Sequence, residues 1–375
     1  MNVVFVCGGS AGHVNPAIAI AEELRNKHPM SKIIFIGADK ALEKRLVPEA
    51  GFELINIKMT GLRRGFSPSD IIYNIKTAIN LVSAERKSSR LLRDFKPDAV
   101  IGTGGYISYP VLKKASKKRI ATFLLEPNAY PGLAVKMLSA SVDKIFIAYK
   151  GAENELKHPE KAVFTGTPLL RRFFENDTGE AEKPEDKKLV VSFWGSLGAA
   201  RMNDMMAEFI KLNVESECFN HIHATGAIGS IDKLKASLSE SGVKNATAPI
   251  ADIREYIDDM PSIMKKADLV MCRAGASTIA ELTAMGKPAI LIPSPNVAEN
   301  HQELNAKQLC SAGGAVMVSE KECDGKVLFD LVRDLLNDGE KLEKMSAFQK
   351  SLSVSDSSSV IIDFIYKFVQ ERRVQ

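Results

Sequence analysis

Three glycines and a histidine follow the first apolar run of the chain. Residues 4–24 read VFVCGGSAGHVNPAIAIAEEL, in which Gly8, Gly9 and Gly12 precede His13. Glycine allows a tight turn that brings backbone N–H groups close to a ligand, and a helix N-terminus favours an anion. An imidazole titrates near neutral pH and suits a general base. The stretch therefore predicts a turn that favours an anion or a developing oxyanion, with a histidine beside it. The alternative is an ordinary tight turn with an incidental histidine.

A second glycine-rich turn follows another apolar run. Residues 101–110 read IGTGGYISYP and place Gly104 and Gly105 before Tyr106 and Ser108, whose hydroxyls are candidate donors. Turns at the carboxyl ends of parallel strands in one domain line the same crevice. Neither turn has the GxGxxG spacing of a dinucleotide-binding loop or the lysine of a P-loop. The alternative is two unrelated turns.

The second half of the chain has two further glycine turns. Residues 194–203, WGSLGAARMN, place Ser196 at the start of a predicted helix, where a diphosphate would be favoured. Residues 273–282, RAGASTIAEL, place Glu281 about one turn into another helix. Its carboxylate could accept both hydroxyls of a ribose. The alternative for Glu281 is compensation of the helix dipole.

Two amides share a helical face further along the chain. Residues 300–309, NHQELNAKQL, separate Gln302 and Asn305 by three positions. Sugar hydroxyls need donors and acceptors together, and an amide supplies both. Exposed surface amides are the alternative, because Gln and Asn are usually found there.

Other chemistries are not supported by the residue pattern. The chain has no D-x-D sequence, no His/Cys cluster and no GxSxG elbow, so we predict no metal site, no cofactor and no serine hydrolase chemistry. Its five cysteines form no CxxC pair, which is typical of reduced thiols in the cytosol.

The elements that must position these residues alternate along the chain. Buried apolar runs separated by helical patterns indicate parallel sheets covered on both faces, an α/β class. The predicted strands are 2–7, 32–37, 53–58, 98–105, 121–126, 144–149, 162–166, 189–195, 221–226, 246–250, 268–275, 287–293 and 314–318. The clearest helices are 16–27, 69–94 and a terminal helix at 356–372.

A polar stretch divides the pattern in two. Residues 175–188 are rich in charge and lack an apolar stripe, which is typical of a linker. We therefore expect an N-terminal domain at 1–170, a linker at 171–188 and a C-terminal domain at 189–355. The helix at 356–372 is expected to pack back on the first domain.

Net charge and hydropathy limit the classes of partner that the sequence supports. A net charge of +4 is too weak to indicate nucleic acid. No apolar run reaches the roughly 18 residues that span a bilayer, and the N-terminus lacks the pattern of a signal peptide. We expect a protein that works inside the cell.

The order of the motifs resembles one family. GGSAGH, GTGGYISYP, EPNAYPGL, GTP, WGSLGA, CRAGASTIAEL and HQELNA resemble, over essentially the whole chain, the MurG family of peptidoglycan N-acetylglucosaminyltransferases. The resemblance implies two facing Rossmann-like domains with a deep inter-domain cleft, the GT-B fold. It implies inverting transfer of N-acetylglucosamine from UDP-GlcNAc to the MurNAc 4-hydroxyl of a polyprenyl-diphosphate acceptor, lipid I, giving lipid II at the cytoplasmic face of the membrane.

The resemblance also implies roles for individual residues. His13 is the expected general base, with Glu126 in reserve. The acceptor diphosphate is expected at Gly9, Ser10, Gly12, Gly104, Gly105 and Tyr106. The donor is expected at Asn128, Ser196, Ile257, Met260, Glu281, Gln302 and Asn305, with Ile257 reading the uracil edge and Glu281 the ribose.

Several loop residues depart from the family pattern. Ser10 and Ala11 replace a Thr and a Gly of the first loop, and Leu125 and Pro127 replace a His and a Gln beside Glu126. Trp194 and Leu197 replace a Gly and a Gln in the third glycine turn, and Leu170 shifts an Arg by one position. His13, Asn128 and Glu281 are retained, so an active enzyme is expected.

A basic, apolar stretch is a candidate membrane surface. Ile71, Ile72, Ile75, Ile79 and Val82 recur at helical spacing among Arg63, Arg64, Lys76, Arg86, Lys87 and Arg90. A basic rim around an apolar face suits an anionic membrane. The alternative is that most of these isoleucines pack into the core.

Two other functions stay open at this point. One is another UDP-sugar enzyme of the same fold, a diacylglycerol glycosyltransferase or a UDP-GlcNAc 2-epimerase. The other is a non-catalytic UDP-sugar-binding protein.

Overall fold

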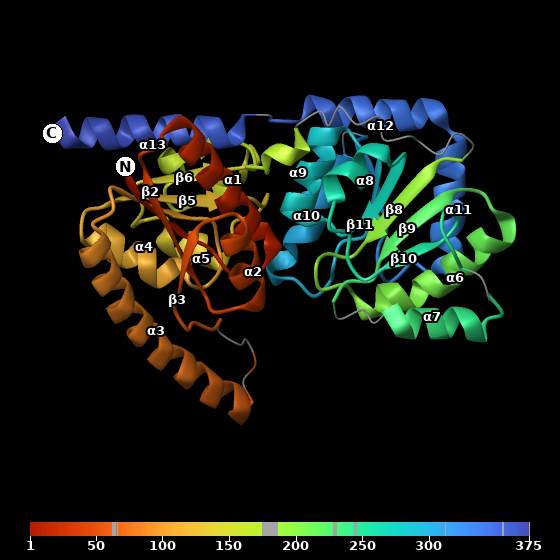
Figure 1. Ribbon diagram of the computed structural model, residues 1–375, viewed down its shortest axis with the longest axis horizontal. Coiled ribbons are helices and arrows are strands. Elements are labelled where there is room, and N and C mark those ends of the chain that lie inside the picture. The colour runs from red at the N-terminus through yellow and green to blue at the C-terminus, as the bar shows by residue number, and fades with distance from the viewer. Residues whose placement is uncertain are drawn as a thin grey trace. The chain divides into compact units, whose positions relative to one another are not determined.

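The protein consists of two compact units (Figure 1). The computed structural model describes residues 1–61, 65, 67–174, 187–227, 231–243, 246–311, 313–354 and 356–374. Unit 1 comprises Met1–Leu170 with Val354–Gln375, and unit 2 comprises Arg171–Ser353.

The described part of unit 1 contains one seven-stranded sheet, and all its strand pairs are parallel. The strand order is β3-β2-β1-β4-β5-β6-β7. The strands are β1 (Asn2–Val6), β2 (Lys32–Gly37), β3 (Glu53–Asn56), β4 (Ala99–Gly102), β5 (Ala121–Glu126), β6 (Lys144–Ile147) and β7 (Ala162–Phe164).

Helices cover both faces of this sheet. Alternate strand residues, such as Phe5 and Val6, enter separate apolar clusters, as the two-residue period of a strand requires. One face packs against α1 (Ala11–Lys27), α2 (Ala41–Glu49) and α13 (Ser357–Val374). The other packs against α3 (Pro68–Phe95), α4 (Ser108–Lys117) and α5 (Leu133–Leu138). The short helices η1 (Ala152–Glu155) and η2 (Pro159–Lys161) precede β7.

Unit 2 repeats this plan with six described strands, also in parallel pairs. The order is β10-β9-β8-β11-β12-β13. The strands are β8 (Leu189–Phe193), β9 (Asn220–Ala224), β10 (Asp252–Arg254), β11 (Leu269–Cys272), β12 (Ala289–Leu291) and β13 (Ala315–Met317).

The helices of unit 2 also form two layers. One layer contains α6 (Ala200–Ser216), α7 (Ile231–Glu240), α11 (Gly325–Asn337) and α12 (Gly339–Ser351). The other contains α8 (Met260–Lys266), α9 (Ala276–Met285) and α10 (His301–Cys310). The short helices η3 (Arg171–Phe173) and η4 (Ala298–Asn300) complete the unit.

Strand order places the glycine turns at equivalent points of the two sheets. In each sheet the connections run in opposite directions from one central strand, which is β1 in unit 1 and β8 in unit 2. The central strands pair with β4 and β11 respectively. Ligands of open α/β sheets bind at this reversal, outside the carboxyl ends of the strands. All four glycine turns of the sequence follow these four strands.

Three predicted boundaries were wrong. The first helix begins at Ala11 rather than near Pro16, so His13 lies inside its first turn. Residues 246–250 are not a strand, because Pro249 cannot donate to a ladder, and the edge strand β10 forms at Asp252–Arg254 instead. The start of the expected linker is also structured, since η3 buries Phe173 and packs against α9, while residues 175–186 lie outside the described ranges.

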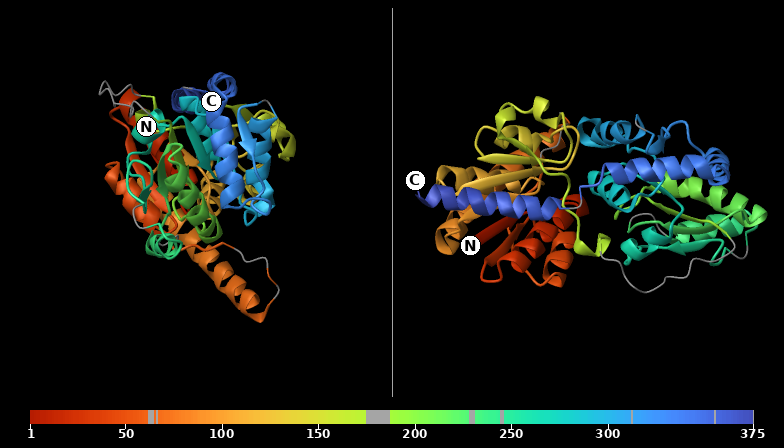
Figure 2. Two further views of the ribbon diagram at one scale, coloured as in Figure 1. Left: turned by 90° about the vertical axis from the view of Figure 1, so that its right-hand side faces the viewer. Right: turned by 90° about the horizontal axis from the view of Figure 1, so that it is seen from above.

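The terminal helix α13 packs on unit 1 (Figures 1 and 2). Its apolar side joins the cluster that α1 and the strands form. The ring of Phe368 lies edge-on to Phe123 at 5.4 Å, and that of Phe364 lies edge-on to Phe146 at 5.6 Å. Lys27 of α1 forms an ion pair of 2.7 Å with Asp363.

Candidate functional site

The imidazole of His13 lies in the first turn of α1. Its Nδ1 is 3.3 Å from the Gly8 carbonyl oxygen and 3.2 Å from Ser10 Oγ. Because a carbonyl can only accept, the contact with Gly8 is favourable when Nδ1 carries the proton. In that tautomer Nε2 holds a lone pair. An imidazole held in this way can accept a proton through Nε2.

The first two glycine turns are in direct contact. A Cβ on Gly104 would lie 2.3 Å from Cδ2 and 2.6 Å from Nε2 of His13, so only glycine leaves room for the ring. A Cβ on Gly105 would lie 2.4 Å from the Gly8 carbonyl oxygen. The hydroxyl of Thr103 donates to the His13 carbonyl at 2.6 Å. The expectation that both turns line one crevice fits this packing.

The two predicted donors of the second turn differ in exposure. Ser108 is buried and donates to the Gly104 carbonyl at 2.7 Å, so its hydroxyl holds the turn together. Tyr106 is 58% exposed, and its ring lies against Gly61, where a Cβ would approach to 2.2 Å. Of the two predicted donors, Tyr106 alone faces solvent.

A buried carboxylate from α2 reaches the first turn. Glu43 Oε1 accepts bonds from the backbone N–H groups of Ala38 and Lys40, at 3.0 and 3.1 Å, and Oε2 accepts from Gly9 at 3.4 Å. The Gly9 N–H is therefore turned toward a protein acceptor. Gly12 lies in the first turn of α1, where N–H groups lack carbonyl partners inside the helix. Sequence reasoning missed Glu43, which lies 34 residues from Gly9.

Glu126 organises the loop that follows β5. Its Oε1 accepts from the backbone N–H and the side-chain Nδ2 of Asn128, both at 2.9 Å, and its Oε2 accepts from Gly132 N–H at 2.7 Å. Burial raises the pKa of this carboxyl above its usual value, while the three bonds act in the opposite direction. Both carboxylate oxygens are engaged, so Glu126 fixes the position of the Asn128 amide.

In unit 2 the glycine turn after β8 lies against the turn after β9. Gly198 has a φ of +77°, and a Cβ there would lie 2.0 Å from the Thr225 carbonyl oxygen. The Ala227 N–H donates to the Ser196 carbonyl at 3.2 Å, which joins the two turns. Ser196 is half-buried and lies four residues before α6, whose first N–H groups have no carbonyl partner inside the helix. The arrangement suits an anion at the start of α6.

Glu281 lies on α9, which follows β11. The helix begins at Ala276 with Gly275 as N-cap. Desolvation raises the pKa of the Glu281 carboxyl to about 8, and the charge of Arg172 partly offsets this. A desolvated carboxyl group has few water partners to lose when it binds a hydroxyl.

The two predicted amides of α10 bond to neighbouring loops. Gln302 Oε1 accepts from the Ser294 N–H at 2.8 Å, after β12. Asn305 is buried, and its Nδ2 donates to the Ala274 carbonyl at 3.3 Å, after β11. The carboxyl ends of β11 and β12 are thus tied to the start of α10.

The remaining predicted donor residues follow β10. Ile257 is buried in the apolar cluster of α8, α9 and α10, and Met260 is the half-buried first residue of α8. The side chain of Asp259 caps that helix by accepting from Ser262 N–H at 3.4 Å.

An ion pair that the sequence did not reveal joins three strand ends of unit 2. Arg273, after β11, donates to the Ile292 carbonyl at 3.0 Å and lies 2.7 Å from the carboxylate of Glu320, after β13. A charged residue directly after a buried strand was the available signal. The partner could not be inferred, because it lies 47 residues away.

The apolar residues of α3 are exposed rather than buried, so the alternative that they form core was wrong. Ser67 caps this helix, and Pro68 occupies its first position. Thr77, Ala84 and Leu92 lie on its buried side. The exposed apolar side chains are Ile71, Ile72, Ile75, Ile79 and Val82, at 52–64%.

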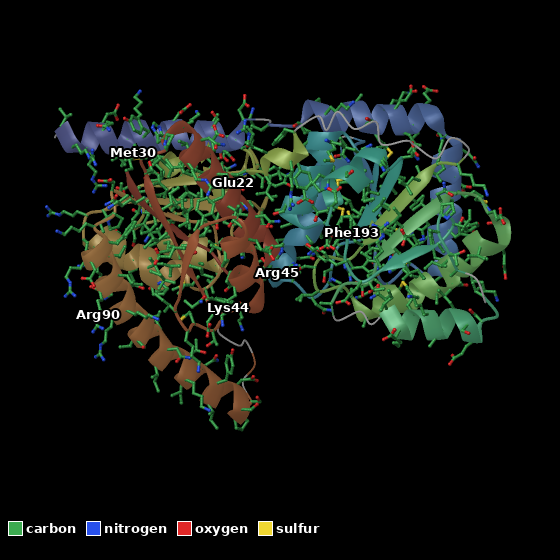
Figure 3. All side chains as sticks on the ribbon, in the orientation of Figure 1. Glu22, Met30, Lys44, Arg45, Arg90 and Phe193 are labelled. Atoms are coloured by element: carbon green, nitrogen blue, oxygen red, sulfur yellow. The ribbon has the colours of Figure 1, made fainter. Side chains whose placement is uncertain are left out.

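Exposed basic side chains accompany them. Lys76, Arg86, Lys87 and Arg90 are exposed on α3, and Arg90 points away from the strands (Figure 3). Arg63 and Arg64 lie outside the described residues. Throughout the described ranges, no helix is long and apolar enough to cross a bilayer. In the same ranges, no three His, Cys, Asp or Glu side chains gather as a metal site would require.

Family models match both halves of the chain. Residues 3–147 match the glycosyltransferase family 28 N-terminal domain, and residues 189–361 match the glycosyltransferase family 28 C-terminal domain.

Curated proteins match over nearly the full length. A protein of Acetivibrio thermocellus is 40% identical over 376 residues, covering 99% of each chain, and one of Alkaliphilus metalliredigens is 39% identical, covering 92% and 93%. Both are named UDP-N-acetylglucosamine–N-acetylmuramyl-(pentapeptide) pyrophosphoryl-undecaprenol N-acetylglucosamine transferase.

Solved structures share the fold. MurG of Acinetobacter baumannii superposes with a TM-score of 0.73 at 24% identity, covering 98% of this chain and 99% of that one. A complex of Staphylococcus aureus MnaA with UDP gives a TM-score of 0.73 at 14% identity, covering 98% and 97%. These neighbours establish two GT-B-type α/β units, as the sequence predicted.

Proposed function

The chain belongs to glycosyltransferase family 28 and is an N-acetylglucosamine transferase of lipid II synthesis, and we propose how its residues carry out the transfer. The donor is UDP-GlcNAc, and the acceptor is the MurNAc 4-hydroxyl of undecaprenyl-diphospho-MurNAc-pentapeptide, lipid I. The names of relatives at 39–40% identity support this substrate pair. Structural neighbours that act as UDP-GlcNAc 2-epimerases share 14–15% identity, which supports a common fold alone.

Unit 2 holds the donor in this proposal. The diphosphate lies at Ser196 and the first turn of α6, where helix N–H groups and the helix dipole favour negative charge. The ribose hydroxyls bond to Glu281, and the uracil edge meets the backbone of Ile257 beside Met260. Gln302 and Asn305 bind the GlcNAc hydroxyls. Their amides also position the loops after β12 and β11, to which they bond. Asn128, whose amide Glu126 holds in unit 1, stays a predicted donor residue.

Unit 1 holds the acceptor and the base. The acceptor diphosphate lies at the first two glycine turns, which include Gly9, Ser10, Gly12, Gly104, Gly105 and Tyr106. His13 Nε2 removes the proton of the attacking hydroxyl. The observation that carries this assignment is the His13 ring, held between the Gly8 carbonyl and Gly104 with Nδ1 as its donor. Glu126 positions Asn128 and is the reserve base.

The reaction is a single displacement. The acceptor oxygen forms a bond to the anomeric carbon as the bond from that carbon to the UDP oxygen breaks, which inverts the configuration. The proton passes to His13, and the electron pair leaves on UDP. Preorganised N–H groups at the start of α6 stabilise the charge that develops on the diphosphate. No metal ion is required for these steps.

The exposed face of α3 binds the membrane in which the acceptor is anchored. Its isoleucines enter the interfacial region, and its lysines and arginines attract anionic headgroups. The protein then acts as a peripheral enzyme on the cytoplasmic side of the bacterial membrane.

Product analysis tests the proposal. The purified chain is incubated with UDP-GlcNAc and, separately, lipid I and diacylglycerol, and a reaction without protein is the control. We expect a β-linked disaccharide on lipid I alone. Glycosylated diacylglycerol, conversion of UDP-GlcNAc into UDP-N-acetylmannosamine, or UDP-GlcNAc binding without any product would each replace the proposal with one of its alternatives.

A further inference from the structure

A chain of buried polar side chains crosses the core of unit 2 below the glycine turn that follows β8. Ser192 Oγ on β8 is 2.8 Å from Nε2 of His221 and 2.7 Å from Nδ1 of His223, both on β9. His223 Nε2 is 3.2 Å from Oδ1 of Asn203, in the second turn of α6. All four side chains are buried. Nothing in the transfer reaction described above uses them.

The direction of each hydrogen bond in this network follows from Asn203, which lies at one end of it. Asn203 Nδ2 donates to the Thr225 carbonyl at 2.9 Å, so Oδ1 is the atom that faces His223. An amide oxygen only accepts, and His223 must therefore carry its proton on Nε2. Burial lowers the pKa of His223 to about 3, which keeps the ring neutral and leaves Nδ1 as an acceptor.

The remaining two bonds are then fixed. Ser192 has a single hydroxyl proton, which it donates to His223 Nδ1, so its oxygen accepts from His221 Nε2. The pKa of His221 is lowered well below its usual value, chiefly by burial and secondarily by His223. No hydrogen-bond partner lies beside His221 Nδ1 among the described residues, as befits a nitrogen without a proton.

The other contact of Asn203 links this hydrogen-bond network to the glycine turn that follows β8. The Thr225 carbonyl that Asn203 holds is the atom against which Gly198 packs, with room for no Cβ. The following residues meet the same turn, because Ala227 N–H donates to the Ser196 carbonyl. A shift of Asn203 therefore moves both α6 and the surface that supports residues 195–199.

We propose that Ser192, His221 and His223 are positioning residues for the nucleotide sugar: their bonds hold Asn203, and through it the Gly195–Ala199 turn, in the conformation that receives the diphosphate. The inference rests on the proposed function, in which this turn binds UDP. The ligand class is a nucleoside diphosphate. The three residues touch neither substrate, so they act on donor affinity and not on the chemical step.

Ser192→Ala is the main test, because it removes the hydroxyl that donates to His223 Nδ1 and accepts from His221 Nε2. Calorimetry should show UDP affinity weakened about 3- to 10-fold, the worth of one neutral hydrogen bond. The KM for UDP-GlcNAc should rise similarly, with kcat at saturating donor nearly unchanged. Ser192→Thr keeps the hydroxyl and should retain near-normal affinity.

Asn213→Ala is the matched control. Asn213 is a buried asparagine of the same helix, and it donates to the Phe219 carbonyl at 2.9 Å, as Asn203 does to Thr225. It lies ten residues further along α6, about 15 Å away. Its loss should lower the melting temperature and leave UDP affinity unchanged. Equal weakening by Asn213→Ala and Ser192→Ala would show general loosening and overturn the inference.

Gly198→Ala distinguishes a failure of the proposed donor site from a failure of the positioning role of Ser192, His221 and His223. Its Cβ would strike the Thr225 carbonyl, so UDP binding should weaken if the turn holds the donor. Unchanged affinity here would reject the donor site and the inference together. Weakened binding in Gly198→Ala with normal binding in Ser192→Ala would reject the inference alone.

A measurement on the unmodified protein covers the case in which Ser192→Ala fails to fold. Nitrogen-15 NMR of labelled imidazoles reports which ring nitrogen is protonated. We expect His223 and His221 as Nε2–H tautomers with and without UDP. A His223 ring protonated at Nδ1 in the UDP complex would overturn the inference.

Discussion

Unit 1 has a histidine at the carboxyl edge of its sheet, whereas unit 2 buries two histidines within β9. The strand orders around the central strands are the same. In unit 1 the two glycine turns contact each other, whereas in unit 2 the glycine turn after β8 contacts the turn after β9. In unit 1 the imidazole of His13 is itself part of the turn. In unit 2 the imidazoles of His221 and His223 lie below the turn, and the carboxyl group that we propose for the ribose, that of Glu281, lies on α9. The same topology therefore holds imidazoles at two depths. We propose that the one at the edge of the sheet reacts and that the two within the strand support the turn.

The first way to break this comparison is to remove the imidazole of unit 1. His13→Ala should lower kcat at saturating acceptor by roughly 10²–10⁴-fold, the usual worth of a positioned base. UDP affinity should hold, because the donor belongs to unit 2. Steady-state kinetics of His13→Ala and Glu126→Gln, measured side by side, decide the assignment. A near-normal kcat for the His13 variant, with the loss confined to acceptor KM, would make His13 a binding residue.

In unit 2 the corresponding change is Glu281→Ala. UDP affinity should fall by about 1–3 kcal/mol, the scale of two hydrogen bonds between the ribose hydroxyls and a carboxyl group whose pKa is raised to about 8. Calorimetry with UDP measures this, and Glu303→Ala on the exposed side of α10 is the control. A calorimetric trace like that of the unmodified protein would remove Glu281 from the donor site.

A third test asks whether unit 1 also carries the membrane surface. Reversing Arg86 and Lys87 to Glu should weaken binding to anionic vesicles about tenfold or more, since each basic residue contributes about 1 kcal/mol. The same reversals at Lys233 and Lys235 on α7 of unit 2 should have little effect. Vesicle sedimentation at low and high salt reads out both. Equal binding to neutral and anionic vesicles would count against the surface.

The raised pKa of Glu281 also predicts a pH effect on stability. Its folded pKa of about 8 lies above the unfolded value of 4.5, so the folded state binds more protons between those limits. The contribution of this group to stability is therefore present below about pH 4.5 and is lost as pH rises toward 8. At pH 8, Glu281→Gln should raise the melting temperature by about 2–4 °C for each kcal/mol regained. A variant that melts with the unmodified protein at pH 8 would contradict this.

The smallest expected effect is that of chelation. If helix N-termini alone carry the diphosphate charge, transfer in EDTA should proceed at the rate seen without it. Activity that disappears in EDTA and returns with Mg²⁺ or Mn²⁺ would show that a metal ion is needed to carry the diphosphate charge.

Local signals in the sequence account for the strands and turns. Buried runs such as VVSF and the glycines that follow them are properties of neighbouring residues, so both sheets and all four turns were predictable. The start of α1 was missed because Pro16 resembles a first helical residue, although the helix tolerates it in its second turn. The isoleucines of α3 follow a helical period that does not distinguish a core face from an exposed one.

Contacts across the fold were beyond such reasoning. Glu43 reaches Gly9, Arg273 reaches Glu320, and Ser192 reaches His221 and His223 only after the strands pair. Apart from Arg273, which follows a buried strand directly, none of these residues stands out in its own stretch. Which buried groups bond is set by strand register, and the register is a property of the assembled sheet.

The return of α13 to unit 1 has a consequence for the order in which the chain folds. Synthesis proceeds from the N-terminus, so the strands of unit 1 leave the ribosome well before the helix that covers Phe123 and Phe146. All of unit 2 is made in the interval, and it can complete its core first. For that time one face of the older sheet remains partly bare, and it is a surface that a nascent-chain chaperone would bind.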